Sequence, residues 1–230
     1  MNLENIKVIA FDADDTLWVN EPYFRKAEQD FCELLQDFMP AATCNKFLFE
    51  IEMQNLPTYG YGIKPFALSL IEAAIKISEN KIPIETISKL IDIAKEMLNM
   101  PIELIDGIEE TLQQLSKKYK LVMATKGDLL DQERKLIKSG LEKYFHHIEV
   151  MSDKKPKQYQ KLIKHLDSKP EEFLMIGNSL KSDILPVLEI GASAIYIPFH
   201  TTWEHEKVDD EVIHSNFKEL KEASDILELL

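Results

Sequence analysis

Five short, continuously apolar runs are the feature that most constrains the fold of this chain. Each run has the length of a strand buried on both faces, and helical patterns at about 129–139, 157–166 and 181–189 separate the last four. The runs cover residues 7–12, 120–125, 147–151, 172–177 and 193–198. Strands that alternate with helices in this way predict an α/β domain, doubly wound around a parallel, Rossmann-like sheet.

The first two runs are separated by far more chain than a crossover helix needs. Within this stretch, apolar residues three and four positions apart predict amphipathic helices at 22–37, 66–78 and 84–98. Residues 57–62, which contain two glycines and a proline, are expected to form the main irregular loop. We therefore expect an α/β core domain over 1–19 and 101–230, with an all-helical second domain inserted over 20–100.

The charge balance of the chain excludes several classes of protein. It carries 27 Lys and Arg residues against 40 Asp and Glu residues, which gives a net charge of −13. Such a charge repels a phosphate backbone, so we expect no nucleic-acid partner. Because 45% of the residues are hydrophobic, the chain can bury a core and is not expected to be disordered.

The sequence also indicates the compartment. No apolar run approaches the ~18 residues of a membrane-spanning helix, and residues 1–5 lack the basic region of a signal peptide. Cys32 and Cys44 follow no metal-ligand spacing and are expected to be buried, reduced thiols. We therefore expect a cytoplasmic protein that does not engage a membrane; nothing in the sequence indicates its oligomeric state.

Three carboxylates follow the first apolar run, at Asp12, Asp14 and Asp15. Ligands of open α/β sheets bind at the carboxyl ends of the strands, which is where these residues are expected. Like charges this close raise one another's pKa unless a cation lies between them. A helix cap or a solvated acidic turn is the alternative interpretation of the same residues.

Other polar residues follow the later runs, at the same expected edge of the sheet. Thr125 and Lys126 precede a helix, whose first amides can bind an anion. Two lysines, Lys154 and Lys155, stand before Pro156, and the fourth run is followed by Gly177, Asn178 and, further on, Asp183. Each group alone could be an ordinary cap or surface charge, but together and in this order they indicate one site.

The set of motifs resembles the haloacid dehalogenase (HAD) superfamily of phosphohydrolases. Its first motif, Asp-x-Asp-x-Thr after an apolar strand, is matched by Asp12, Asp14 and Thr16, and its second by Thr125. Its third motif is a lysine, commonly before proline, and its fourth is matched in part by Gly177 and Asp183. The resemblance spans the whole chain, because the helical insert stands where one class of the family places its cap domain.

Two positions depart from the family pattern or leave it ambiguous. Asn178 stands where the phosphatases usually have Asp, which leaves open whether it contributes to a metal site. Lys155 precedes the proline, but Lys154 has the more usual spacing to Tyr159 and Gly177. We favour Lys154 as the third-motif lysine and keep Lys155 as the alternative.

The resemblance implies a magnesium-dependent phosphatase that acts on a small phosphorylated metabolite. Asp12 would be the nucleophile that forms an aspartyl-phosphate, and Asp14 the general acid and base. The implied Mg²⁺ ligands are Asp12, the backbone carbonyl of Asp14, and Asp183. The residues expected to bind the phosphoryl group and substrate are Thr125, Lys126, Lys154 and Asn178.

Three other activities stay open at this stage. A dehalogenase ranks lower, because a halide leaving group needs no proton and Asp14 is present. A phosphomutase shares the whole catalytic core. A phosphate-binding module with poor turnover is the non-enzymatic alternative, and Asn178 is the residue that favours it.

Overall fold

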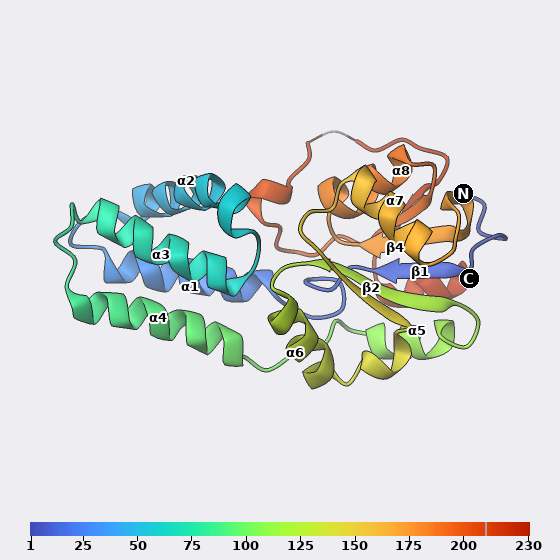
Figure 1. The fold of residues 1–230 in the computed structure, drawn as a ribbon, viewed down its shortest axis with the longest axis horizontal. Coiled ribbons are helices and arrows are strands. Elements are labelled where there is room, and N and C mark those ends of the chain that lie inside the picture. The colour runs from blue at the N-terminus through green and yellow to red at the C-terminus, as the bar shows by residue number, and fades with distance from the viewer. Residues whose placement is uncertain (210) are drawn as a thin grey trace. The chain divides into compact units, whose positions relative to one another are not determined.

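The computed structural model describes residues 1–209 and 211–230. It divides into two compact units, whose elements are labelled in Figure 1. The first unit contains 1–21, 102–126 and 132–230, and the second contains 22–101 and 127–131. The expected boundaries near 20 and 100 lie within two residues of this division, whereas 127–131, expected in the core domain, group with the helices.

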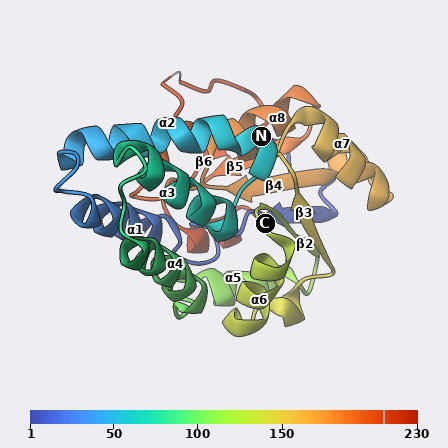
Figure 2. The same ribbon diagram turned by 60° about the vertical axis from the view of Figure 1, so that its left-hand side comes forward.

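The first unit is built on a six-stranded sheet whose paired strands are all parallel, in the order β3-β2-β1-β4-β5-β6 (Figure 2). The strands are β1 (Val8–Phe11), β2 (Lys120–Lys126), β3 (His147–Met151), β4 (Phe173–Gly177), β5 (Ser193–Tyr196) and β6 (Phe217–Glu219). The predicted doubly wound fold and its five strands are confirmed. The sixth strand was not predicted, because its three residues include two exposed charged ones and form no apolar run.

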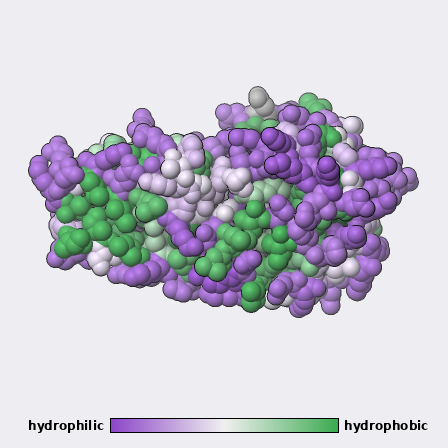
Figure 3. Space-filling view, viewed as in Figure 1, coloured by the Kyte–Doolittle hydropathy of each residue, from purple (hydrophilic) through white to green (hydrophobic). Residues whose placement is uncertain are grey.

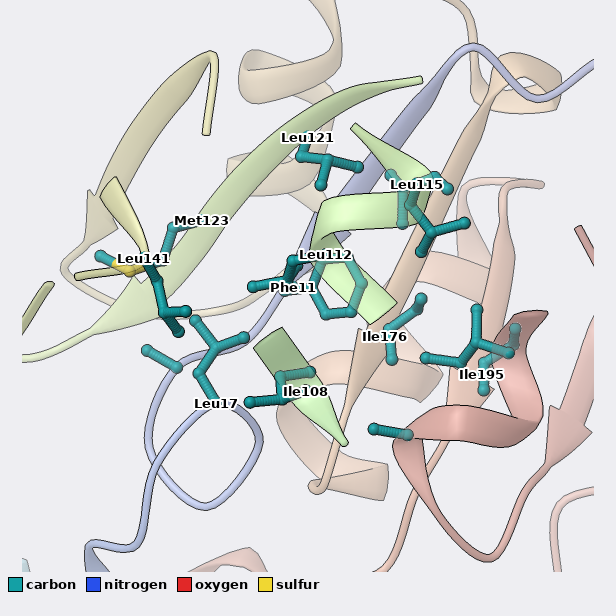
Figure 4. Packing of buried hydrophobic residues seen from close by; sticks show 14 of the residues in the cluster. Phe11, Leu17, Ile108, Leu112, Leu115, Leu121, Met123, Leu141, Ile176 and Ile195 are labelled. Atoms are coloured by element: carbon teal, nitrogen blue, oxygen red, sulfur yellow. The ribbon is translucent and has the colours of Figure 1, made fainter. Parts of the chain in front are cut away.

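The alternation of side chains along each strand explains why helices cover both faces of the sheet. Ile9 and Phe11 of β1 pack with α5 (Ile108–Leu115) in one hydrophobic cluster, which Figure 4 shows. Val8 and Ala10 point to the opposite face and pack with α7 (Pro156–His165) and α8 (Leu185–Glu189). Strand β1 therefore lies in the middle of the fold, with its carboxyl end flanked by β2 and β4.

The helix expected at 181–189 is divided in two. Residues Leu180–Ile184 form a π-helical turn, and α8 begins only at Leu185 with Pro186 in its first turn. Ser179 caps the turn: its carbonyl accepts from the amide of Asp183, and its hydroxyl accepts from the amide of Ser182 at 3.0 Å. The wider turn carries Asp183, one of the expected metal ligands.

The second unit is helical. It contains α1 (Glu21–Leu34, whose first residue belongs to the first unit), α2 (Ala41–Tyr59), α3 (Ile63–Ile77) and α4 (Ile84–Asn99). Its core includes Phe31, Leu48, Leu70 and Leu90, and both cysteines are free and buried, as expected. The loop predicted at 57–62 is shorter than expected: Pro57 lies inside α2, which continues to Tyr59 although the proline removes one i→i−4 hydrogen bond.

The face of the molecule seen in Figure 3 is mostly polar. Figure 3 shows a largely hydrophilic face with hydrophobic side chains over α6 (Leu129–Ser139) and over α3 and α4. The exposed apolar side chains of these helices include Leu130 and Ile137 on α6 and Ile75, Ile84 and Ile91 on α3 and α4. No helix within the described residues combines the length and the apolar character needed to cross a membrane.

Candidate active site

The three carboxylates at the end of β1 have different hydrogen-bond partners. Asp15 has a φ of 63°, a left-handed conformation that Asp tolerates better than most residues. Its carboxylate accepts from the backbone amides of Asn20 at 2.8 Å and Glu21 at 3.0 Å, at the start of α1. Asp15 therefore caps the start of α1, a contact that Asp12 and Asp14 do not share.

Lys154 brings two distant parts of the chain together. Its side chain is fully buried, and its ammonium donates to Asp12 Oδ1 and, at 2.6 Å, to Asp183 Oδ1. Lys155, in contrast, is 70% exposed and pairs with Asp153 at 2.7 Å. Of the two lysines that the sequence left open, the structure thus brings Lys154 to Asp12 and Asp183.

The three buried groups do not balance in charge. Two carboxylates around one ammonium leave a net charge of −1 when all are ionised. Burial raises the pKa of Asp12 to about 7, although Lys154 opposes this shift, and Asp183 raises it further. Burial alone would lower the pKa of Lys154, but the two carboxylates hold it above its ordinary value. A further cation would relieve this imbalance.

Asp183 lies against the end of β4, and Gly177 is what permits it. A Cβ atom at Gly177 would lie only 2.2 Å from Asp183 Oδ2. The same carboxylate oxygen accepts from the backbone amide of Ser179 at 3.0 Å. The glycine of the fourth motif therefore leaves room for the carboxylate, and the next turn orients it.

Asn178 lies beside the same carboxylates. With its NH₂ group turned toward them, the amide donates to Asp12 Oδ2 and to the carbonyl oxygen of Asp14, each at 3.3 Å, and to Thr16 Oγ1 at 3.2 Å. Thr16 Oγ1 in turn donates to Asp12 Oδ2 at 3.2 Å. The amide is thus within reach of two of the three expected metal ligands.

Asp14 is held by partners that the sequence analysis did not identify. Its carboxylate accepts from Lys135 Nζ at 2.9 Å, Gln132 Nε2 at 2.8 Å and Trp18 Nε1 at 2.8 Å. Burial alone would raise the pKa of Asp14, but Lys135 and the other donors lower it below its usual value. Gln132 and Lys135 stand three residues apart on one face of α6, which is the signal that could have indicated a shared target.

Thr125 and Lys126 end β2. Thr125 is buried, and its hydroxyl donates to the carbonyl oxygen of Lys126 at 3.1 Å. The ammonium of Lys126 pairs with Glu206 at 2.5 Å and donates to Ser182 Oγ at 2.9 Å. Glu206 was not among the predicted site residues, because it follows β5 in a loop with no motif around it.

The carboxylate and carbonyl oxygens around Asp12 fit a magnesium ion. Within the described residues there is no group of three or more His, Cys, Asp or Glu side chains arranged to hold a metal. Mg²⁺ does not need one, since it usually binds one or two carboxylates and completes its shell with water and phosphate oxygens. Asp12 and Asp183 already converge on one cationic group, the Lys154 ammonium, and the carbonyl oxygen of Asp14 lies near the Asn178 amide that Asp12 also contacts.

Comparisons with known proteins agree with the motif pattern. Residues 6–191 match the family model described as haloacid dehalogenase-like hydrolase. A glyceraldehyde 3-phosphate phosphatase from Pyrococcus furiosus is 25% identical over 204 residues, which cover 86% of this chain and 82% of that protein.

Two solved structures illustrate the likeness of the fold. A haloacid dehalogenase-like family hydrolase from Xanthomonas campestris has a TM-score of 0.87 and 36% identity, with 98% of this chain and 91% of that chain covered. A 2-haloacid dehalogenase from Pseudomonas syringae has a TM-score of 0.64 and 19% identity, with 97% of each chain covered. The fold is thus shared by proteins named for different reactions.

Proposed function

Because this chain belongs to the haloacid dehalogenase-like hydrolases, we propose that it is a magnesium-dependent phosphatase that hydrolyses a small phosphate monoester. The observation that carries the proposal is the convergence of Asp12 and Asp183 on the buried ammonium of Lys154, with Asp14 two residues beyond Asp12. This arrangement supports the assignment of Asp12 as nucleophile, with a charge partner and a second carboxylate beside it at the carboxyl end of β1.

In the first half of the proposed reaction, the carboxylate of Asp12 attacks phosphorus, and the bond to the leaving oxygen breaks. Asp14 gives its proton to that oxygen, so the product leaves as an alcohol. Asp14 must turn from the donors that keep it ionised in order to carry this proton, since Lys135 favours the carboxylate form.

In the second half, water attacks the phosphorus of the aspartyl-phosphate while Asp14 takes a proton from it. Inorganic phosphate leaves, and Asp12 is regenerated as a carboxylate. Lys154 neutralises charge beside Asp12 throughout, and Thr125 is available at the end of β2 to bind a phosphoryl oxygen.

Asp12, Asp183 and the carbonyl oxygen of Asp14 would hold the magnesium ion. When bound, the ion would balance the charge of the incoming phosphate and stabilise the transition state. Its positive charge would also balance the net negative charge of the Asp12–Lys154–Asp183 group.

Asp14 favours a phosphatase over a dehalogenase. The fold does not separate the two, since a protein named as a 2-haloacid dehalogenase shares it. Displacement of a halide needs no general acid, whereas an alkoxide leaves well only when it is protonated. The relative from Pyrococcus furiosus, named as a phosphatase, supports the same choice. In this proposal the helical unit corresponds to the family's cap domain.

Hydrolysis of p-nitrophenyl phosphate with Mg²⁺ tests the proposal, followed by a panel of phosphorylated metabolites that includes glyceraldehyde 3-phosphate. Wild-type turnover should vanish in EDTA and return with Mg²⁺. Asp12→Asn should remove activity, and Asp14→Asn should reduce it severely. Equal rates for the three proteins would refute the mechanism, and turnover that survives EDTA would remove the metal from it.

A further inference from the structure

A second charged cluster lies beside the proposed active site, around Glu206. This residue belongs to a single 3-10 turn, Glu204–Glu206, in the loop that follows β5. Its Oε1 atom pairs with Lys126 Nζ at 2.5 Å, and both side chains are largely buried, at 12% and 14% exposure. Lys126 is the last residue of β2, immediately after Thr125.

The other oxygen of Glu206 binds the turn that follows β4. Oε2 accepts from the hydroxyl of Ser182 at 2.6 Å and from the hydroxyl of Ser179. Ser182 Oγ also accepts from Lys126 Nζ at 2.9 Å, which closes a ring of hydrogen bonds. One carboxylate thus ties together the ends of two strands and the loop after a third.

The two serines are the residues that orient Asp183. The amide of Ser179 donates to Asp183 Oδ2 at 3.0 Å, and the amide of Ser182 donates to Ser179 Oγ at 3.0 Å. Asp183 itself follows Ser182 directly in the π-helical turn. Glu206 therefore reaches an expected metal ligand through a single intervening residue.

The charge of Glu206 is part of this arrangement. Burial alone would raise its pKa, but Lys126 and the hydrogen bonds from Lys126, Ser179 and Ser182 lower it to about 2. The carboxylate is thus ionised at neutral pH and can accept from all three donors at once. A neutral side chain of similar size would lose the attraction to Lys126.

We propose that Glu206 is a positioning residue that fixes the Ser179–Asp183 turn and holds the ammonium of Lys126, and that it thereby sets the affinity of the site for Mg²⁺. The proposal rests on the proposed function, because it takes Asp183 as a metal ligand. It also assigns Lys126 a role other than the expected one: its ammonium stabilises this turn instead of binding substrate.

A neighbouring residue supplies a matched control. Glu204 stands on the same 3-10 turn and pairs with Lys207 at 2.5 Å, but both side chains are more than half exposed. Exposed ion pairs of this kind contribute little to stability. Substitution of Glu204 changes the charge of the same turn without touching Ser179, Ser182 or Lys126.

The test compares Glu206→Gln and Glu206→Ala with Glu204→Gln and the wild type. Mg²⁺ is titrated into each folded protein in a calorimeter, and thermal unfolding is measured in parallel without metal. We expect Mg²⁺ binding to weaken by about 10- to 100-fold in the Glu206 variants, the range found when partners of metal ligands are removed. Glu204→Gln should bind Mg²⁺ within twofold of the wild type.

A purely structural role predicts a different result: a lower melting temperature with unchanged Mg²⁺ affinity in the folded Glu206→Gln protein, which would overturn the proposal. Equal losses in Glu204→Gln and Glu206→Gln would overturn it as well. A wild type that binds no Mg²⁺ would overturn both this proposal and the metal dependence of the proposed function. A wild type that binds Mg²⁺ but hydrolyses no phosphate monoester would overturn the proposed function alone.

Discussion

Three largely buried carboxylates of the α/β unit differ from one carboxylate of the helical unit in what lies beside them. In the α/β unit, the carboxylates of Asp12, Asp183 and Glu206 each meet a buried or nearly buried lysine. In the helical unit, Glu52 of α2 has a buried Oε1 atom with no hydrogen-bond partner, and burial raises its pKa to about 8.

The difference indicates which of these buried carboxylates depend on their charge. A buried carboxylate that keeps its charge requires a partner whose own burial also costs free energy, so such pairs are maintained where the charge is used. A buried carboxyl group that becomes neutral avoids the larger cost of a buried charge and requires no charged partner. Substitutions on the two sides should therefore fail in different ways.

Asp12→Asn should have the largest effect, because it removes the nucleophile and leaves an amide of nearly the same size. We expect kcat for p-nitrophenyl phosphate to fall by about 10³-fold or more, as for other essential nucleophiles. The melting temperature should not fall in proportion, since the buried carboxylate pair is relieved at the same time. Steady-state kinetics and calorimetry on the same preparation check both statements.

Lys154→Met should come next and should affect both stability and activity. The substitution leaves Asp12 and Asp183 buried without their counter-charge, which typically costs about 3–5 kcal/mol. Urea unfolding should show this loss, and phosphatase activity should fall with it.

Lys155→Met is the matched control, because the neighbouring lysine is exposed and pairs only with Asp153. Its unfolding free energy should stay within about 0.5 kcal/mol of the wild type. Equal losses for the two lysines would break the distinction between paired and solvated charge on which the comparison rests.

Asn178→Asp, unlike the substitutions above, should strengthen the binding of Mg²⁺. The amide lies 3.3 Å from Asp12 Oδ2 and from the carbonyl oxygen of Asp14, so a carboxylate there would face the bound cation directly. We expect the Mg²⁺ concentration for half-maximal activity to fall by about tenfold, or ~1.4 kcal/mol. An unchanged or higher Mg²⁺ concentration for half-maximal activity in the variant would show that the amide is the better ligand or lies outside the site.

Glu52→Gln should have the smallest effect on activity, and its effect on stability should depend on pH. The folded-state pKa of Glu52, about 8, lies above the ordinary value of 4.5, mainly because of burial and to a lesser extent because of Glu28. The folded protein therefore binds this proton more tightly than the unfolded chain, and stability is lost as pH rises from about 4.5 through 8.

Replacing the Glu52 carboxyl by an amide removes this titration, so the variant should gain much more stability relative to the wild type at pH 8.5 than at pH 5. Thermal melts at the two pH values measure this difference. Glu50→Gln, on the same helix but exposed, serves as the control and should shift neither melt. A Glu52→Gln protein that is no more stable at pH 8.5 would mean that the carboxylate finds a partner in solution.

Some errors of the sequence analysis share a physical origin. The strand β6 was missed, and the helix α2 was given no bounds within the expected helical insert, because neither shows a clean one-sided apolar pattern. Each packs within its own unit. The expected helix at 181–189 was divided because Ser179 caps a wider turn and Pro186 begins a new helix. Local periodicity carries no information about such side-chain caps.

By itself, the sequence determined the parallel sheet and the position of Asp12 and Asp14 at the end of its central strand. Apolar runs and their spacing depend on interactions between near neighbours, which a linear pattern records. Only the tertiary structure decided that Lys154 and not Lys155 meets Asp12, 142 positions away, that Lys135 holds Asp14, and that Glu206 braces the turn of Asp183. These contacts join side chains that the fold alone brings together.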